Sequence, residues 1–138
     1  HEHGPKGGDE LNLIKAGKNY GWPKTSYGVN YSGTIITPFK RLPGIENPLS
    51  YWIPSIAPSG MTYYDKNTFP DWKESLFISS LKSKDVRRLK LQNNQVVVQE
   101  LLLSEINARI RHIATRPNGN LIVLSDEKKG RIIEISPK

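Results

Sequence analysis

Short apolar runs follow one another at regular intervals along the second half of the chain, separated by polar turn residues. Such regular spacing of short runs and turns is typical of successive β-strands rather than of a βαβ arrangement. Between successive runs stand Asn93-Asn94, Asn118-Gly119 and Lys129-Gly130, and tight turns favour Asn and Gly. The pattern predicts an all-β fold, built as a meander or as propeller blades. The runs occupy residues 76–81, 85–91, 95–103, 109–115, 120–126 and 131–136.

These runs group into one complete and one incomplete four-stranded unit. Residues 60–65 alternate weakly and are predicted as an inner strand, which completes a blade over residues 59–103. Residues 104–138 supply only three strands of a second blade. Because an unpaired sheet edge is a liability, we expect the fourth strand to come from sequence outside this chain. If the chain folds alone, its open edges predict self-association between copies.

The first part of the chain, residues 1–58, differs from the second half in composition and pattern. It is rich in Gly, Pro, Tyr and Asn and alternates poorly, which predicts long loops with short strands near residues 12–15 and 34–37. Disordered segments are typically poor in aromatic residues, so the aromatic density here predicts ordered, functional loops. The aromatic residues are Tyr20, Trp22, Tyr27, Tyr31, Tyr51 and Trp52.

Composition narrows the classes of function. The chain has 20 Lys and Arg against 13 Asp and Glu, a net charge of +7. The cations are scattered and no nucleic-acid-binding motif occurs, so we expect no nucleic-acid partner. No run approaches the roughly 18 apolar residues of a membrane helix. With no cysteine, disulfides and Cys-based zinc or redox chemistry are excluded. The first residues contain no apolar signal segment and are expected to lie inside a longer protein.

A Gly-rich stretch near the start is a candidate cation site. Gly4 and Pro5 present backbone carbonyls, since Pro5 has no N–H and Gly4 permits close approach. Carbonyls beside carboxylates such as Asp9 and Glu10 suit a hard cation such as Ca²⁺. A plain surface turn explains the same residues, and the residues alone leave both interpretations open.

Charged residues at the ends of the predicted strands form a second candidate site. Lys82 follows an apolar strand and is either a solvated edge charge or a cation for an anionic ligand. Alternation places Arg109 and Arg111 on one face of a strand, as a clamp for carboxylates or as an ordinary polar face, with His112 opposite. Asp126 closes another strand, where a carboxylate is ordinarily a local cap. The spacing of the histidines identifies no catalytic base, so we assign no catalytic residue.

In this order, these features resemble the C-terminal part of the soluble quinoprotein sugar dehydrogenases, the glucose/sorbosone dehydrogenase family, and most closely its bacterial aldose sugar dehydrogenase branch. The resemblance implies a partial six-bladed β-propeller of about two blades plus long N-terminal loops. It also implies oxidation of an aldose to its lactone with pyrroloquinoline quinone and Ca²⁺, an electron acceptor as partner, and a periplasmic or secreted location. The matching stretches are HGPKGGDELNLIKAGKNYGWP, WIPSIAPSGMTYYD, FPDWKESLFISSLK, RIRHIATRPNGNLIVLSD and GRIIEISP.

The resemblance also assigns roles to single residues. Gly4 and Pro5 correspond to the carbonyls that hold the cofactor's calcium, and an aromatic near the sugar corresponds to Trp52. The residues that correspond to quinone ligands are Lys82, Arg109, Arg111 and Asp126.

The chain also departs from the family. The histidine that serves the family as catalytic base has no counterpart here, so the chain alone is expected to be inactive. His112 stands where the family usually has Asp, which favours an alternative: a non-enzymatic propeller module that binds or scaffolds.

Overall fold

The structure is a computed structural model and describes residues 1–137. The chain forms two compact units, His1–Ala57 and Pro58–Lys138, and each is described by itself. Within residues 1–137 the only helices are two short 3₁₀ turns, η1 (Pro70–Trp72) and η2 (Ser104–Ile106). No helix in the described residues has the length and apolarity needed to cross a membrane. The expectation of an all-β chain is therefore confirmed.

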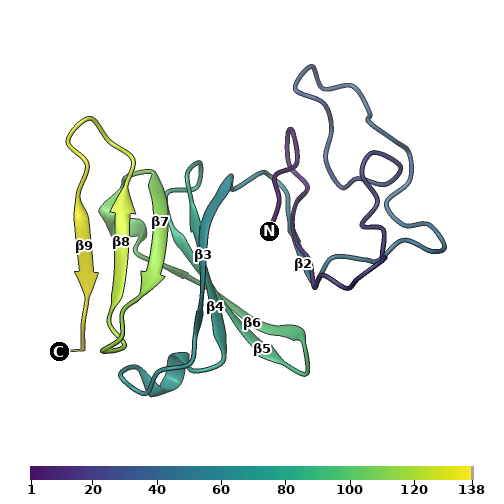
Figure 1. Cartoon of the computed structure of the whole chain (residues 1–138). Coiled ribbons are helices and arrows are strands. Elements are labelled where there is room, and N and C mark those ends of the chain that lie inside the picture. The colour runs from purple at the N-terminus through teal and green to yellow at the C-terminus, as the bar shows by residue number, and fades with distance from the viewer. Residues whose placement is uncertain (138) are drawn as a thin grey trace. The chain divides into compact units, whose positions relative to one another are not determined.

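The second unit begins with a four-stranded antiparallel sheet (Figure 1). Its order follows the sequence, and β5 and β6 are joined by a turn in which Asn93 and Asn94 both have positive φ, 50° and 58°. Asparagine tolerates this conformation better than most residues, which is why the pair works as a hairpin turn. The strands are β3 (Pro58–Tyr64), β4 (Ser75–Ser80), β5 (Val86–Gln92) and β6 (Gln95–Leu102).

A three-stranded antiparallel sheet follows, made of β7 (Ile110–Thr115), β8 (Leu121–Ser125) and β9 (Ile132–Ile135). All six apolar runs predicted as strands are strands, with ends that differ from the prediction by one residue at most. Strict alternation nevertheless fails in β7, where the register shifts between Ile110 and His112. The bulge lets both Ile110 and Ile113 point into the core, while Arg111 and His112 are both exposed.

The two sheets pack through a shared apolar core. It contains Tyr64 and Phe77 from the first sheet and Ile113 and Val123 from the second, all at most 1% exposed. Strand β3 lies beside β7 and runs in the same direction (Figure 1). The Ser59 hydroxyl donates to the carbonyl of Ile110, and further along both strands the hydroxyls of Thr62 and Thr115 are hydrogen-bonded.

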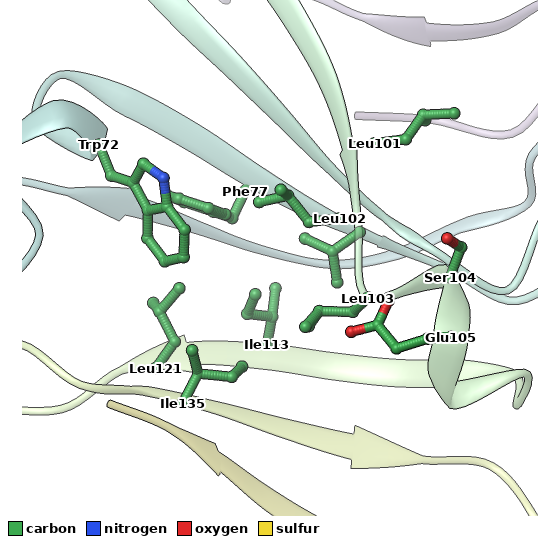
Figure 2. A pocket seen from close by; sticks show the side chains of 11 residues that line it. Trp72, Phe77, Leu101, Leu102, Leu103, Ser104, Glu105, Ile113, Leu121 and Ile135 are labelled. Atoms are coloured by element: carbon green, nitrogen blue, oxygen red, sulfur yellow. The ribbon is translucent and has the colours of Figure 1, made fainter. Parts of the chain in front are cut away.

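An apolar cavity of about 290 Å³ remains between the two sheets, beside β6 and the link that follows it. Figure 2 shows side chains around it from both sheets, among them Leu102 and Ile135, together with Trp72 of η1. The two sheets of the second unit therefore pack face to face. The loops at one end of the sheets lie outside this core and can carry polar groups.

The first unit, His1–Ala57, is mostly irregular. Its strands are β1 (Asp9–Leu11) and β2 (Ser50–Trp52), which pair antiparallel with Asp9 opposite Trp52. The predicted short strands near residues 12–15 and 34–37 are wrong: neither segment is a strand, and Ile35 makes only an isolated bridge to Val29. The strand that does form, β1, was missed because its pairing partner β2 lies about forty residues further along the chain. Local sequence carries no signal of such distant pairing.

Candidate functional site

Arg109, Arg111 and Asp126 meet at one end of the second sheet. Arg109 immediately precedes β7, and Asp126 immediately follows β8, its antiparallel neighbour. The Asp126 N–H donates to the carbonyl of Arg109 at 2.7 Å, which fixes the two ends against each other. Both guanidiniums then donate to the same carboxylate oxygen, Oδ2 of Asp126, Arg109 through Nε and Arg111 through Nη2, each at 2.9 Å. The expected placement of the two arginines on one face is confirmed.

The electrostatics of this trio favour an additional anion. The hydrogen bond from Arg109, together with the charge and hydrogen bond of Arg111, lowers the pKa of Asp126 below its ordinary value. Two cations against one anion leave one positive charge at the cluster. The side chains of Arg109 and Arg111 are about half exposed, at 52% and 54%. Each guanidinium uses one N–H on Asp126 and keeps further donors, so the cluster can bind a carboxylate or phosphate.

Lys82 lies at the same end of the unit. It is exposed in the turn between β4 and β5, and in residues 1–137 no hydrogen bond or ion pair joins it to the arginine trio. Its turn is tied to the start of β7 indirectly, because Lys84 donates to the side chain of Asn107 at 3.3 Å. The structure thus brings Arg109, Arg111 and Asp126 into contact and leaves Lys82 as a solvated charge at the same end.

The Gly4–Pro5 turn lies in the first unit and is tightly built. Gly4 is buried, and a Cβ there would lie 2.0 Å from the carbonyl oxygen of Gly7, so no larger residue fits. The N–H of Gly4 donates to Asp9 Oδ1 at 2.9 Å, and the N–H of Lys6 donates to the carbonyl of Val29 at 3.1 Å. The stretch that carries the Gly4 and Pro5 carbonyls is therefore held on both sides.

The carboxylates expected beside this turn behave differently from each other. Asp9 is fully buried and its oxygens accept backbone N–H groups, so its expected place beside a cation, as a ligand, is not supported by its contacts. Glu10 is buried beside Asn12, and burial raises its pKa, with the charge of Glu2 adding to the effect against the Asn12 hydrogen bond. The Asn12 amide nitrogen bridges Glu2 and Glu10, and Asn12 Oδ1 is buried with no hydrogen-bond partner in the described residues.

A concavity of about 310 Å³ borders the Gly4–Pro5 turn within the first unit. It is also lined by Trp22 and Tyr31, which are 59% and 80% exposed. Neither was assigned a role from the sequence, although the density of aromatic residues in these loops was the signal that pointed to them. Trp52, in contrast, is only 5% exposed at the end of β2. Within residues 1–137 no three His, Asp or Glu side chains gather as a metal site.

Comparison with known proteins identifies the family. The family described as Glucose / Sorbosone dehydrogenase matches residues 1–134. The chain belongs to this family. Aldose sugar dehydrogenase YliI of Escherichia coli K12 is 44% identical over 140 aligned residues, which cover 100% of this chain and 38% of that protein.

Solved structures of the family match the fold closely. A crystal structure of glucose dehydrogenase is 46% identical, with a TM-score of 0.95 over 100% of this chain and 40% of that one. The structure of a Streptomyces coelicolor aldose sugar dehydrogenase in its PQQ-bound form has a TM-score of 0.70 at 24% identity, over 98% of this chain and 38% of that one, and supports the fold alone. The chain spans about two fifths of the length of the family members that it matches.

Proposed function

We propose that this chain is the C-terminal part of a quinoprotein sugar dehydrogenase, which oxidises an aldose to its lactone with pyrroloquinoline quinone and Ca²⁺. In this proposal the chain supplies part of the cofactor site and is inactive alone. Membership of the sugar dehydrogenase family and the 44% identity with Escherichia coli aldose sugar dehydrogenase YliI support the reaction class. The residues proposed to bind the quinone are Lys82, Arg109, Arg111 and Asp126.

The convergence of Arg109 and Arg111 on Asp126 is the observation that carries the proposal. Pyrroloquinoline quinone carries three carboxylates, and a guanidinium pair with spare donors suits such groups. Asp126 holds both side chains in place before any ligand arrives, which reduces the conformational entropy lost on binding. The exposure of Lys82 fits a further contact with an anionic or carbonyl group of the cofactor.

We propose that the carbonyls of Gly4 and Pro5 bind the calcium ion. Neutral oxygen donors of this kind suit Ca²⁺, and Gly4 and Pro5 both line the concavity of the first unit. A bound quinone would supply a hydride acceptor for the sugar, and a bound calcium ion would supply Lewis acidity. The contribution of this chain is to bind and orient: cationic side chains neutralise the carboxylates, and the held turn presents oxygens to the ion.

Further parts of the proposal concern the whole protein. The four-stranded sheet is proposed as a complete blade of a six-bladed propeller, residues 59–103, and the three-stranded sheet as an incomplete blade, residues 104–138. The open edges at β6 and β9 predict pairing with further strands, or self-association where these are absent. A small sugar, an electron acceptor and a periplasmic or secreted location complete the proposal.

Quinone binding and dye reduction test this function. The protein expressed from its complete coding sequence is titrated with pyrroloquinoline quinone in calcium buffer, and then assayed with aldoses and a dye acceptor. Arg109→Met is expected to weaken quinone binding by about tenfold or more, since a charge-assisted hydrogen bond is lost. Arg116→Met is the matched control, because Arg116 makes a comparable exposed ion pair with Glu134 at the other end of β7.

The alternative, a propeller module that binds or scaffolds without catalysis, is favoured by one observation: His112 stands where the family usually has Asp. The same titration separates the two functions. Calorimetry that detects no quinone binding, with no dye reduction for any sugar, would support the scaffold and refute the enzyme. If Arg109→Met binds the quinone as tightly as the wild-type protein, the assignment of Arg109, Arg111 and Asp126 to the quinone site is refuted. The dye assay would still decide the reaction class.

A further inference from the structure

We propose that Asp9 is the positioning residue of the calcium turn: its buried carboxylate holds the backbone that carries the Gly4 and Pro5 carbonyls. This inference rests on the proposed function, since it concerns the calcium site assigned there. The Asp9 side chain is 0% exposed, although an uncompensated buried carboxylate is among the costliest groups in a protein. Its retention in the interior therefore calls for partners, and all of the partners described are hydrogen-bond donors.

On one side the carboxylate holds the turn itself. Asp9 Oδ1 accepts the N–H of Gly4 at 2.9 Å. Pro5 has no N–H, so the N–H groups nearest to the two proposed ligand carbonyls are those of Gly4 and Lys6. The N–H of Lys6 is bonded to the carbonyl of Val29, so Asp9 supplies the other half of the restraint. Loss of the Asp9 bond frees the peptide unit that precedes Gly4 to rotate.

On the other side the same carboxylate holds a distant segment of the first unit. Asp9 Oδ2 accepts the N–H of Ile56 at 2.7 Å and that of Ala57 at 3.0 Å, and the Ser55 hydroxyl donates to it at 2.8 Å. Ala57 has a φ of 52°, a conformation that L-residues rarely adopt, and the bond to Asp9 helps to hold it there. One buried side chain thus ties the turn to a segment 46 to 48 residues further on.

Asp9 acts through the backbone and is not itself a ligand. The carboxylate accepts from four donors, the N–H groups of Gly4, Ile56 and Ala57 and the one Ser55 hydroxyl, so both of its oxygens face N–H or O–H groups. Only a side chain with acceptors alone fits this environment. Asparagine has the same shape but places an NH₂ donor against backbone N–H donors, so Asp9→Asn removes the restraint with little change in volume.

The test measures calcium dependence of quinone binding in the protein expressed from its complete coding sequence. Quinone absorbance is followed while calcium is titrated, and circular dichroism monitors folding. Asp9→Asn is expected to raise the calcium concentration at half-saturation by about tenfold or more, because supporting contacts of a metal site have effects of that size. Excess calcium is expected to restore quinone binding. Hydrogen exchange of the wild-type protein without calcium is expected to show protection of the Gly4 N–H.

Two control variants separate positioning from general stability. Ser55→Ala removes one donor from the same carboxylate and keeps the Gly4 bond, and Asp85→Asn alters the other buried aspartate, which is 4% exposed. Both are expected to lower stability and to leave the calcium midpoint unchanged. Three results would overturn this inference and leave the proposed function standing. They are an unchanged calcium midpoint in Asp9→Asn, a shift of the same size in either control, and a Gly4 N–H that is not protected from exchange. A wild-type protein that binds no quinone at any calcium concentration overturns the proposed function as well.

Discussion

Gly60 of β3 packs directly against the backbone of His112 in β7. A Cβ built on Gly60 would lie 2.8 Å from the Cα of His112 and 2.7 Å from its Nδ1. The two strands can approach this closely only because one of them has no side chain at the contact. The same contact lies next to the bulge that leaves Arg111 and His112 both exposed, so it supports the strand that carries the arginine trio.

Gly60→Ala is therefore expected to destabilise the protein by about 1–3 kcal/mol, the usual cost of forcing extra volume into a packed interior. The atoms that it meets include backbone atoms, which cannot rotate away. Urea unfolding followed by circular dichroism measures the change. Gly130→Ala serves as the control, because a Cβ there meets only ordinary contacts, the nearest at 3.5 Å. Equal stability of the two variants would contradict the packing described for Gly60.

Tyr64 and Tyr63 are neighbours in β3 with opposite environments, buried at 0% and exposed at 50%. The Tyr64 hydroxyl donates to the carbonyl of Gly119 at 2.8 Å and accepts the N–H of Phe69 at 3.1 Å. Tyr64→Phe leaves both backbone groups without this partner and is expected to cost about 1–3 kcal/mol of unfolding free energy. Tyr63→Phe is the matched control and should leave thermal stability unchanged. A smaller loss for Tyr64→Phe than for its neighbour would refute the assignment.

Arg88 places its guanidinium in the interior of the first sheet, with a side chain only 7% exposed. Glu100 of β6 binds it through both carboxylate oxygens at 2.8 Å. Glu100→Ala is expected to destabilise by about 2 kcal/mol, because a buried cation loses its counter-ion while Glu100 itself is partly solvated. Thermal unfolding measures this loss of stability. Glu134→Ala, which breaks an exposed pair with Arg116, should cause no measurable change, and a similar loss there would show that burial does not decide the effect.

The pKa of Asp126 is expected to depend on its two arginine partners. Because its folded-state pKa lies below the unfolded value of about 3.9, the interaction stabilises the fold above that pH and is lost as the pH falls through the folded-state pKa. Arg109→Met and Arg111→Met are each expected to raise the pKa of Asp126, since the hydrogen bond from Arg109 and the charge and hydrogen bond of Arg111 all lower it.

Carboxyl ¹³C NMR follows this titration in the cofactor-free protein. Glu127 provides an internal control, because hydrogen bonds from Ser125 and then Arg131 lower its pKa without either arginine of the trio. A pKa of Asp126 that does not change in either variant would show that the ion pairs do not form in solution.

The sequence alone determined most of the second unit. Its strands follow short apolar runs and its turns follow Asn and Gly, both of which are properties of neighbouring residues. Alternation also predicted that Arg109 and Arg111 share a face, and the order of charged residues at strand ends identified Asp126 and Lys82 as candidates. What alternation did not predict is the bulge in β7, because a register shift depends on how the core on both sheets is filled.

Only the tertiary structure decided the first unit. The strand Asp9–Leu11 exists because Ser50–Trp52 pairs with it, and the strands predicted near residues 12–15 and 34–37 do not form. The sequence marked Asp9 as a calcium neighbour, whereas the fold turns its carboxylate to N–H groups 5 to 48 residues away. The physical reason is that burial of a charge is settled by donors from distant segments, and no local pattern records where those donors will lie.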